Sequence, residues 1–452
     1  MIHFYSTNRR SPRVDLGEAL LQGQAPDKGL YMPEKLPRFS KEFLRRAKDL
    51  SYPELAVEIL APYAESVFSR EVLSEICQDA YDFPVPLEQV SGRHYVLRLD
   101  QGPTASFKDF AARFMGRALG RLVREKGQEL LILTATSGDT GGAVAHAFLG
   151  VKDVRVLVLY PIAEVSDRQR KQMTTLGGNV ATLALDSKFD DCQALVKQAF
   201  SDPDLAALNL SSANSINIGR LLPQSVYYLY AASRLADIGG GEPVVFSVPC
   251  GNFGDLMGGV LCFKSGLPVS RFVVATNAND EVPRFLETGN YQKIDPSLGC
   301  ISNAMNVGHP SNLARLVALY DGRMDEKGVL HVQPSMDALR RDFYAVSISD
   351  EETRQTLSKV QKEHGVMLEP HGAVSWAGLE RFMAVHPESA QLAAISLETA
   401  HPAKFPDEVR KLTGLEPALP SSMQGLDVKP ERIVESASDY ATFKAHLLKE
   451  YR

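Results

Sequence analysis

The chain has 452 residues, with 49 Lys and Arg against 55 Asp and Glu, so its formal net charge is −6. This balance argues against general binding of nucleic acid or anionic membranes, because both need a surplus of basic residues. Hydrophobic residues make up 44% and charged residues 23%, which is ordinary for globular proteins and excludes a wholly disordered chain. At roughly 100–200 residues per domain, the length predicts about two to four domains, or one two-lobed enzyme.

The five cysteines are few and widely spaced, and none forms a C-x-x-C pair: Cys77, Cys192, Cys250, Cys262 and Cys300. We therefore expect neither a disulfide scaffold nor a zinc ribbon. No close pair of histidines has the spacing of metal ligands, so we expect no metal site. There is no signal-peptide pattern and no apolar run of about 18 residues, so we expect a cytoplasmic protein.

Residues 1–80 are predicted to form an N-terminal, mainly helical cap, with apolar residues at helical spacing in 40–50 and 53–68. After about residue 95, short apolar runs alternate with Gly-rich turns and helical patterns. Strands are predicted at 130–136, 154–160, 244–249, 272–276 and 393–397. Continuous apolar strands that alternate with helices indicate parallel sheets covered on both faces, hence an α/β fold. Ligands of such sheets bind at the carboxyl ends of the strands.

Lys108 lies in Gly102–Phe110, near the start of a predicted helix that Thr104 or Ser106 could cap. A lysine amine forms a Schiff base with a carbonyl once burial lowers its pKa. An isolated lysine is usually an exposed surface residue. Here phenylalanines flank it at 107 and 110, which favours a partly buried amine.

Three polar turns are candidate anion sites. The turn Ser137-Gly138-Asp139-Thr140 brings hydroxyls and free N–H groups to the start of a helix, which suits a carboxylate or phosphate but also an ordinary capped turn. The turn Cys250-Gly251-Asn252-Phe253-Gly254-Asp255 has two glycines that permit close backbone approach to an anion. It lacks the G-x-G-x-x-G pattern, so it suits a single phosphate, provided that Asp255 points elsewhere.

The third turn runs Asn214-Ser215-Ile216-Asn217-Ile218-Gly219-Arg220 and offers a second anion site, because an arginine can bind an oxyanion through two hydrogen bonds. Taken alone, the pattern favours a polar loop with a surface arginine over an anion site. His401, just after the last predicted strand, is either an active-site residue or a structural histidine.

These four segments, in this order, resemble the threonine synthase family, and the likeness runs along essentially the whole chain. The stretches that carry it include 133–148, 213–218, 248–256, 275–286 and 399–405. The resemblance implies the two-lobed fold of pyridoxal-phosphate enzymes of the tryptophan synthase β type. It also implies the last step of threonine biosynthesis, in which O-phospho-L-homoserine and water give L-threonine and phosphate by γ-elimination and β-addition.

The resemblance further implies residue roles. Lys108 is the catalytic residue, which holds pyridoxal 5′-phosphate as a Schiff base. The other implied cofactor-binding residues are Asp139, Gly251, Asn252, Phe253, Gly254, Asp255 and Thr399, and the implied substrate-binding residues are Ser137, Gly138, Thr140, Asn214, Ser215 and Arg220. The sequence departs from the family pattern at Asp100-Gln101 and Ala105-Ser106, where family members often have Phe-His and Leu-Ala. Substrate positioning near Gln101 is the property most exposed to this difference.

Three alternatives stay open. A serine/threonine dehydratase or cysteine synthase shares the lysine and the phosphate turn but needs no second phosphate pocket, and a related phospholyase would stop at a keto acid. A non-catalytic relative would not be expected to keep an intact Lys108 and both turns. We expect a small-molecule phosphorylated amino acid as the substrate, a monomer or homodimer, and a large cofactor-binding domain (81–110 and 212–452) beside a small one (111–211).

Overall fold

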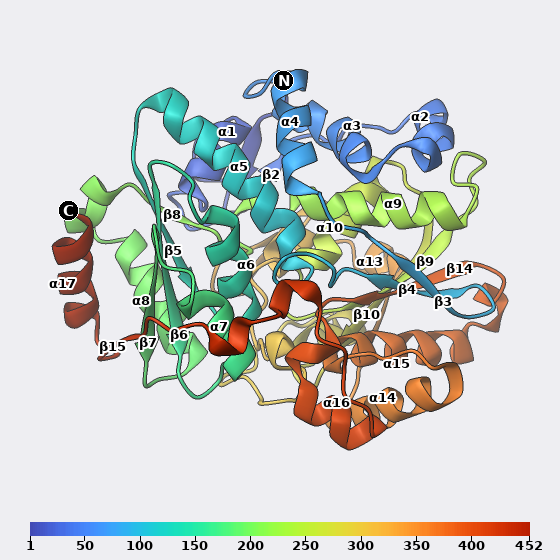
Figure 1. The fold of residues 1–452 in the computed structure, drawn as a ribbon. Coiled ribbons are helices and arrows are strands. Elements are labelled where there is room, and N and C mark those ends of the chain that lie inside the picture. The colour runs from blue at the N-terminus through green and yellow to red at the C-terminus, as the bar shows by residue number, and fades with distance from the viewer.

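The computed structural model describes residues 1–452, which form two parallel β-sheets with helices on both faces of each (Figure 1). The larger sheet has the strand order β13 (Phe343–Ser347), β10 (Val269–Thr276), β9 (Val244–Pro249), β14 (Ala393–Glu398), β4 (His94–Arg98) and β3 (Leu87–Ser91). Its neighbours run parallel except for the edge pair β3 and β4. The smaller sheet is entirely parallel, in the order β15 (Val434–Ser436), β7 (Val180–Leu185), β6 (Val154–Pro161), β5 (Leu130–Ala135) and β8 (Leu210–Ser212). The predicted α/β class is therefore confirmed.

The central strands are buried along their whole length. Every residue of β5, β9 and β14 is buried, as their continuous apolar sequences predict for strands covered on both faces. Apolar side chains of both sheets and of the N-terminal helices join in one core of 89 buried residues. Because neighbouring strands are parallel, the turns that follow β5, β9 and β14 leave their sheets at the carboxyl ends, where ligands bind.

Helices surround the two sheets (Figure 1). The N-terminal region contains a short β-pair, β1 (Phe4–Ser6) with β2 (Tyr31–Pro33), and the helices α1 (Leu16–Gln22), α2 (Lys41–Arg46), α3 (Tyr52–Ala64) and α4 (Arg70–Ala80). The long helix α5 (Lys108–Lys126) is followed by α6 (Asp139–Phe148), α7 (Asp167–Thr174) and α8 (Phe189–Phe200) around the smaller sheet. A second short β-pair consists of β11 (Arg323–Met324) and β12 (Leu330–Val332). The remaining helices are α9 (Ser225–Leu235), α10 (Gly254–Ser265), α11 (Glu281–Thr288), α12 (Leu313–Leu319), α13 (Met336–Asp342), α14 (Asp350–His364), α15 (Pro370–Val385), α16 (Pro406–Thr413) and α17 (Tyr440–Tyr451).

The C-terminal tail lies against the smaller sheet, which differs from the sequence prediction that 212–452 belongs to the large domain. Strand β15 pairs with β7, and Phe443 and Leu447 of α17 pack into the apolar cluster formed by β5, β6 and α8. Figure 1 shows this red segment at the outer side of the smaller sheet. The physical reason is that β7 would otherwise present an unpaired edge, and the tail supplies the missing strand.

None of the helices combines the length and the apolar character that crossing a membrane requires.

Candidate active site

The turns singled out from the sequence meet in one cavity of about 510 Å³ between the carboxyl ends of the two sheets. Thirteen of the fourteen predicted site residues line it: Lys108, Ser137, Asp139, Thr140, Asn214, Ser215, Arg220, Gly251, Asn252, Phe253, Gly254, Asp255 and Thr399. The exception is Gly138. Residues that are more than 250 positions apart in the sequence, such as Lys108 and Thr399, thus face the same space.

Lys108 is the first residue of α5 and follows a tight turn in which Ala105 has a left-handed backbone (φ 55°). The expected capping by Thr104 or Ser106 is wrong. Instead Asp109 accepts hydrogen bonds from the Thr104 backbone N–H (2.9 Å) and hydroxyl (2.6 Å). The reason is that the chain enters the helix through an αR residue, Phe107, and not through the extended conformation that a capping side chain needs. Asp109 therefore closes the turn that presents the lysine.

The Lys108 amine is largely enclosed, with 12% of the side chain exposed. Its Nζ lies 3.4 Å from Asp139 Oδ2 and 4.5 Å from the centre of the Phe107 ring. Burial lowers the pKa of Lys108; the Asp139 carboxylate opposes this shift, while the charges of Lys404 and Arg220 add to it. An amine with a lowered pKa is more often neutral near pH 7, and only the neutral form can attack a carbonyl or accept a proton.

The turn after β5 presents polar groups at the start of α6. Thr136 Oγ1 accepts hydrogen bonds from the backbone N–H groups of Gly138 (2.9 Å) and Gly141 (2.8 Å), which shapes the turn. No side chain caps the helix at this end, and Ser137 and Thr140 face the cavity. Gly138 has φ 135° and packs against α7: a Cβ there would lie 2.4 Å from the side chain of Gln169. A glycine at this position therefore permits close packing of the turn against α7, and Gly138 does not line the cavity.

The turn after β9 is a backbone cradle. Phe253 is left-handed (φ 62°), and no side chain caps α10. The backbone N–H groups of Gly251 to Asp255 donate to no backbone oxygen, so they are free to bind an anion. The Asp255 carboxylate, the group that would oppose an anion, accepts hydrogen bonds from the hydroxyls of Tyr227 (2.6 Å) and Tyr228 (2.7 Å).

The pKa of Asp255 also lies above that of a surface aspartate. Burial raises its pKa from 3.8 to about 6, while the two tyrosine hydroxyls and the Lys108 charge counteract part of the shift. The free backbone N–H groups at the start of α10, which no side chain caps, are what a phosphate group requires.

Arg220 is a buried cation without a counter-ion. Its side chain is 3% exposed, Nη1 donates to the Ala213 carbonyl (2.5 Å), and Nε has no partner. No carboxylate lies within ion-pair distance, and burial lowers the pKa of Arg220 to about 10. A buried guanidinium without a counter-ion is costly, which points to an anionic ligand. Asn214 and Ser215 line the cavity beside it.

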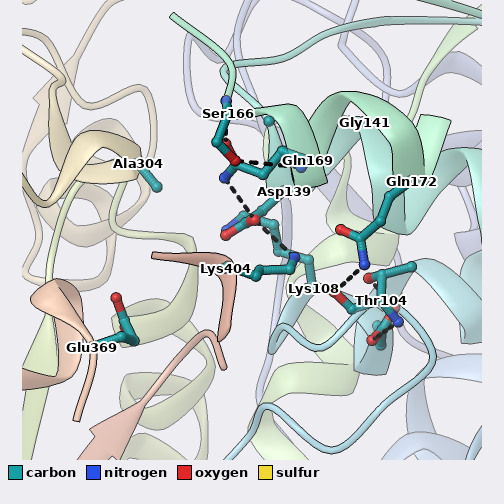
Figure 2. Close-up of polar contacts among 12 residues, drawn as sticks. Thr104, Lys108, Asp139, Gly141, Ser166, Gln169, Gln172, Ala304, Glu369 and Lys404 are labelled. Carbon is teal, nitrogen blue, oxygen red and sulfur yellow. Dashed lines mark hydrogen bonds and ion pairs between the residues drawn. The ribbon is translucent and has the colours of Figure 1, made fainter. Parts of the chain in front are cut away.

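Sequence reasoning missed Lys404 and Gln169, which both bind Asp139 (Figure 2). Lys404 Nζ lies 2.8 Å from Asp139 Oδ1, and Gln169 Nε2 donates to the same oxygen at 2.9 Å. These partners hold the pKa of Asp139 far below its usual range against the effect of burial, Lys404 and then Lys108 being the main causes. Lys404 lies within the segment 399–405 that carries the resemblance, but only Thr399 and His401 of that segment were considered as site residues.

Arg315 and His371 are two more residues of the site that sequence reasoning missed. Arg315, fully buried on α12, donates to the carbonyls of Ser215 (3.0 Å) and Ile216 (2.7 Å) and so fixes the turn that leads to Arg220. His371 accepts the Ala304 N–H through Nε2 (3.1 Å) and lines the cavity. His401 has a structural role, because its Nδ1 accepts the Ala403 N–H (3.1 Å) and caps a short helix. The sequence does contain a signal for Arg315, because it is the one charged residue in the otherwise apolar segment 313–319.

Comparison with known proteins identifies the family. A model described as "Pyridoxal-phosphate dependent enzyme" matches residues 82–396, one described as "Threonine synthase N terminus" matches 3–81, and one described as "Threonine synthase, C-terminal" matches 372–447. A threonine synthase from Haemophilus influenzae is 40% identical over 99% of this chain and 100% of its own length. One from Escherichia coli is 41% identical over 93% of each. The chain belongs to the threonine synthase family.

Structural likeness agrees with this assignment. The structure of a threonine synthase from Brucella melitensis, described as bound to PLP, has a TM-score of 0.91 and 34% identity over 100% of both chains. The enzyme thus has the two-lobed fold of this pyridoxal-phosphate family, depends on pyridoxal phosphate, and acts as a lyase in threonine formation. The dehydratase alternative is disfavoured, because the matches at 3–81 and 372–447 are specific to threonine synthases. No cluster of three or more His, Cys, Asp or Glu side chains has the arrangement of a metal site.

Proposed function

We propose that this cavity converts O-phospho-L-homoserine and water to L-threonine and phosphate, with Lys108 as the amine that binds pyridoxal phosphate. One observation carries the proposal: two separate anion-binding elements, the turn 251–255 and Arg220, line the same cavity as one buried amine. A phosphorylated substrate and a phosphorylated cofactor need two such elements at once, whereas a dehydratase needs only one.

The residues of the chain fit the cofactor. The free N–H groups of Gly251 to Asp255 would bind its phosphate, Lys108 its aldehyde carbon, and Thr399 its ring nitrogen. Asp139 would stand beside the ring hydroxyl. When bound, pyridoxal phosphate delocalises the negative charge that develops on the substrate carbon next to the nitrogen. Because the Thr399 hydroxyl is neutral, it does not favour protonation of the ring nitrogen as a carboxylate would.

The Lys108 amine would carry the proton transfers. Its neutral form takes the proton from the substrate α-carbon, and its lowered pKa makes that form available near neutral pH. An exposed lysine, with a pKa of about 10.4, would be protonated and could not act as a base. After phosphate has left from the γ-carbon and water has added at the β-carbon, the same amine releases the product.

The substrate's two anionic groups would bind at opposite sides of this amine. We assign the carboxylate to Ser137 and Thr140 at the start of α6, and the phosphate to Arg220 with Asn214 and Ser215. The unpaired Nε of Arg220 gives the phosphate a charge-assisted hydrogen bond in a site from which water is largely excluded. Binding at both ends orients the α- and β-carbons toward Lys108.

We also infer that the two sheets, each with its helices, are lobes that close on the substrate and exclude bulk water. A cytoplasmic location is supported by five free cysteines, four of which are buried. For the assembly we propose a monomer or homodimer, which sedimentation equilibrium would distinguish.

The deciding experiment incubates the purified, cofactor-loaded enzyme with O-phospho-L-homoserine and identifies both products by mass. We expect threonine and phosphate in equal amounts. Phosphate with 2-oxobutanoate would retain the cofactor and substrate pocket but contradict the addition of water. Absence of phosphate would contradict the substrate assignment, beginning with Arg220.

A further inference from the structure

Asp139 lies between two lysines that come from different parts of the chain. Lys404, in the segment between β14 and α16, reaches Oδ1 at 2.8 Å, while Lys108, at the start of α5, approaches Oδ2 at 3.4 Å (Figure 2). The pairing with Lys404 spans 265 residues. The site assignments above give Lys404 no part.

The two amines have different access to the cavity. The Lys404 side chain is 0% exposed and does not line the cavity, whereas Lys108 is 12% exposed and does. Lys404 is also the closer partner of the carboxylate. A ligand in the cavity can therefore reach Lys108 but not Lys404, so Lys404 acts through Asp139 and not by direct contact.

The charge balance around Lys108 shows what this arrangement achieves. Four groups face its amine: Asp139 from α6, Lys404 from the segment after β14, Arg220 from the turn before α9, and Asp255 from α10. Without Lys404, the buried Asp139 carboxylate would have Lys108 as its only cationic partner at ion-pair distance. A buried carboxylate strongly favours a protonated neighbour. With Lys404 present, the carboxylate is already neutralised at its other oxygen.

We propose that Lys404 is a positioning residue whose ammonium neutralises Asp139, so that Lys108 is left free to react as an uncharged amine. This inference rests on the proposed role of Lys108. It predicts that the charge of Lys404 matters more than its shape. Because the Lys404 side chain is 0% exposed, solvent screens its attraction to Asp139 only weakly.

The experiment compares Lys404→Met and Lys404→Gln, which lose the charge, with Lys404→Arg, which keeps it. Lys171→Met is the matched control, because it removes an ion pair between α7 and Asp427 without touching Asp139. Each full-length protein is loaded with pyridoxal phosphate, and its visible absorbance is titrated with pH. The cofactor is then removed, and the rate at which each chain recaptures pyridoxal phosphate is measured from pH 6 to 10. Reduction with borohydride and peptide mass analysis identify the modified lysine.

We expect the pH midpoint of recapture to rise by about one unit in both uncharged variants, which corresponds to about a tenfold slower rate at pH 8. Lys404→Arg and Lys171→Met should stay close to the unmodified protein. An unchanged midpoint in the uncharged variants, or an equal shift in Lys404→Arg, would overturn the inference. If Lys404→Met does not fold, Lys404→Gln gives the same comparison, since its amide still donates to Asp139. A label on any lysine other than Lys108 in the unmodified protein would instead overturn the proposed function.

Discussion

The turns after β5 and β9 are built alike but shift the pKa values of their aspartates in opposite directions. Each follows a fully buried parallel strand, begins a helix that no side chain caps, and places an aspartate in the first helical turn. Asp139 has two lysines and a glutamine as partners, and its pKa is far below the usual range. Asp255 has two tyrosine hydroxyls, and burial raises its pKa to about 6.

The difference teaches that position at a helix start does not determine the charge of a buried aspartate. The positive end of the helix dipole acts on both, yet the side chains that arrive from elsewhere decide the outcome. The turn after β5 thus concentrates charge around the reactive amine. The turn after β9 instead pairs its aspartate with neutral hydroxyls and leaves its backbone N–H groups free to hold an anion.

Removal of the amine that both turns face should have the largest effect. Lys108→Ala should lower turnover at least about a thousandfold, because the Schiff base and the proton acceptor are lost together. Steady-state kinetics and the visible absorbance of the bound cofactor would measure this. Lys126→Ala, at the far end of the same helix, is the control and should keep both properties. Normal turnover in Lys108→Ala would refute the assignment.

Loss of the Arg220 charge should affect substrate binding, whereas a change in the turn 251–255 should affect cofactor binding. Arg220→Met should raise KM for O-phospho-L-homoserine about ten- to hundredfold, the value of a charge-assisted hydrogen bond, while the cofactor absorbance is retained. Arg234→Met is a matched control, since that arginine also donates to backbone carbonyls but lies outside the cavity. An unchanged KM would remove Arg220 from the substrate site.

The backbone cradle can be tested with two glycines of the same turn. In Gly251→Ala the new Cβ would lie 2.9 Å from the Ala304 oxygen and the Met305 Cα, so the turn must shift. In Gly254→Ala the nearest atom is 3.4 Å away. We expect Gly251→Ala to weaken pyridoxal phosphate binding about tenfold, as overpacking costs about 1–3 kcal/mol. Gly254→Ala should change it less than about threefold; equal effects in an absorbance titration would contradict the cradle.

The smallest effect concerns stability. The folded-state pKa of Asp255 lies above its unfolded value. The contribution of this group to the free energy of unfolding is therefore lost as pH rises from 3.8 to about 6. Asp255→Asn removes the titration. The free energy of unfolding of Asp255→Asn, relative to the unmodified chain, should therefore increase by about 1–3 kcal/mol between pH 4 and 7.5. Urea unfolding of the cofactor-free chains would measure it, and a decrease over this range would contradict the raised pKa.

The sequence predicted the parts of the molecule that depend on local patterns. The apolar runs at 130–136 and 244–249 identified central strands, and the Gly-rich turns that follow them indicated the edge where ligands bind. The resemblance then supplied roles for residues in those turns. Even the conflict at Asp255 was visible, because a carboxylate next to a phosphate site demanded an explanation.

The remainder depends on contacts between distant segments, which no local pattern contains. Lys404 meets Asp139 across 265 residues, and Arg315 meets Ser215 across 100. The tyrosines that bind Asp255 stand in an unremarkable apolar helix, α9. The resemblance assigns Gly138 to the substrate, but the close contact with Gln169 that requires a glycine at this position comes from α7, 31 residues later, and could not be predicted locally.

The position of β15 has a consequence for the order in which the enzyme can be made. Thr182, in β7, donates to the carbonyl of Arg432, 250 residues later, just before β15 begins. The edge of β7 therefore stays open during synthesis until the segment that contains β15 has been made. A chain that lacked β15 would keep every proposed catalytic side chain but expose that edge to pairing with other chains.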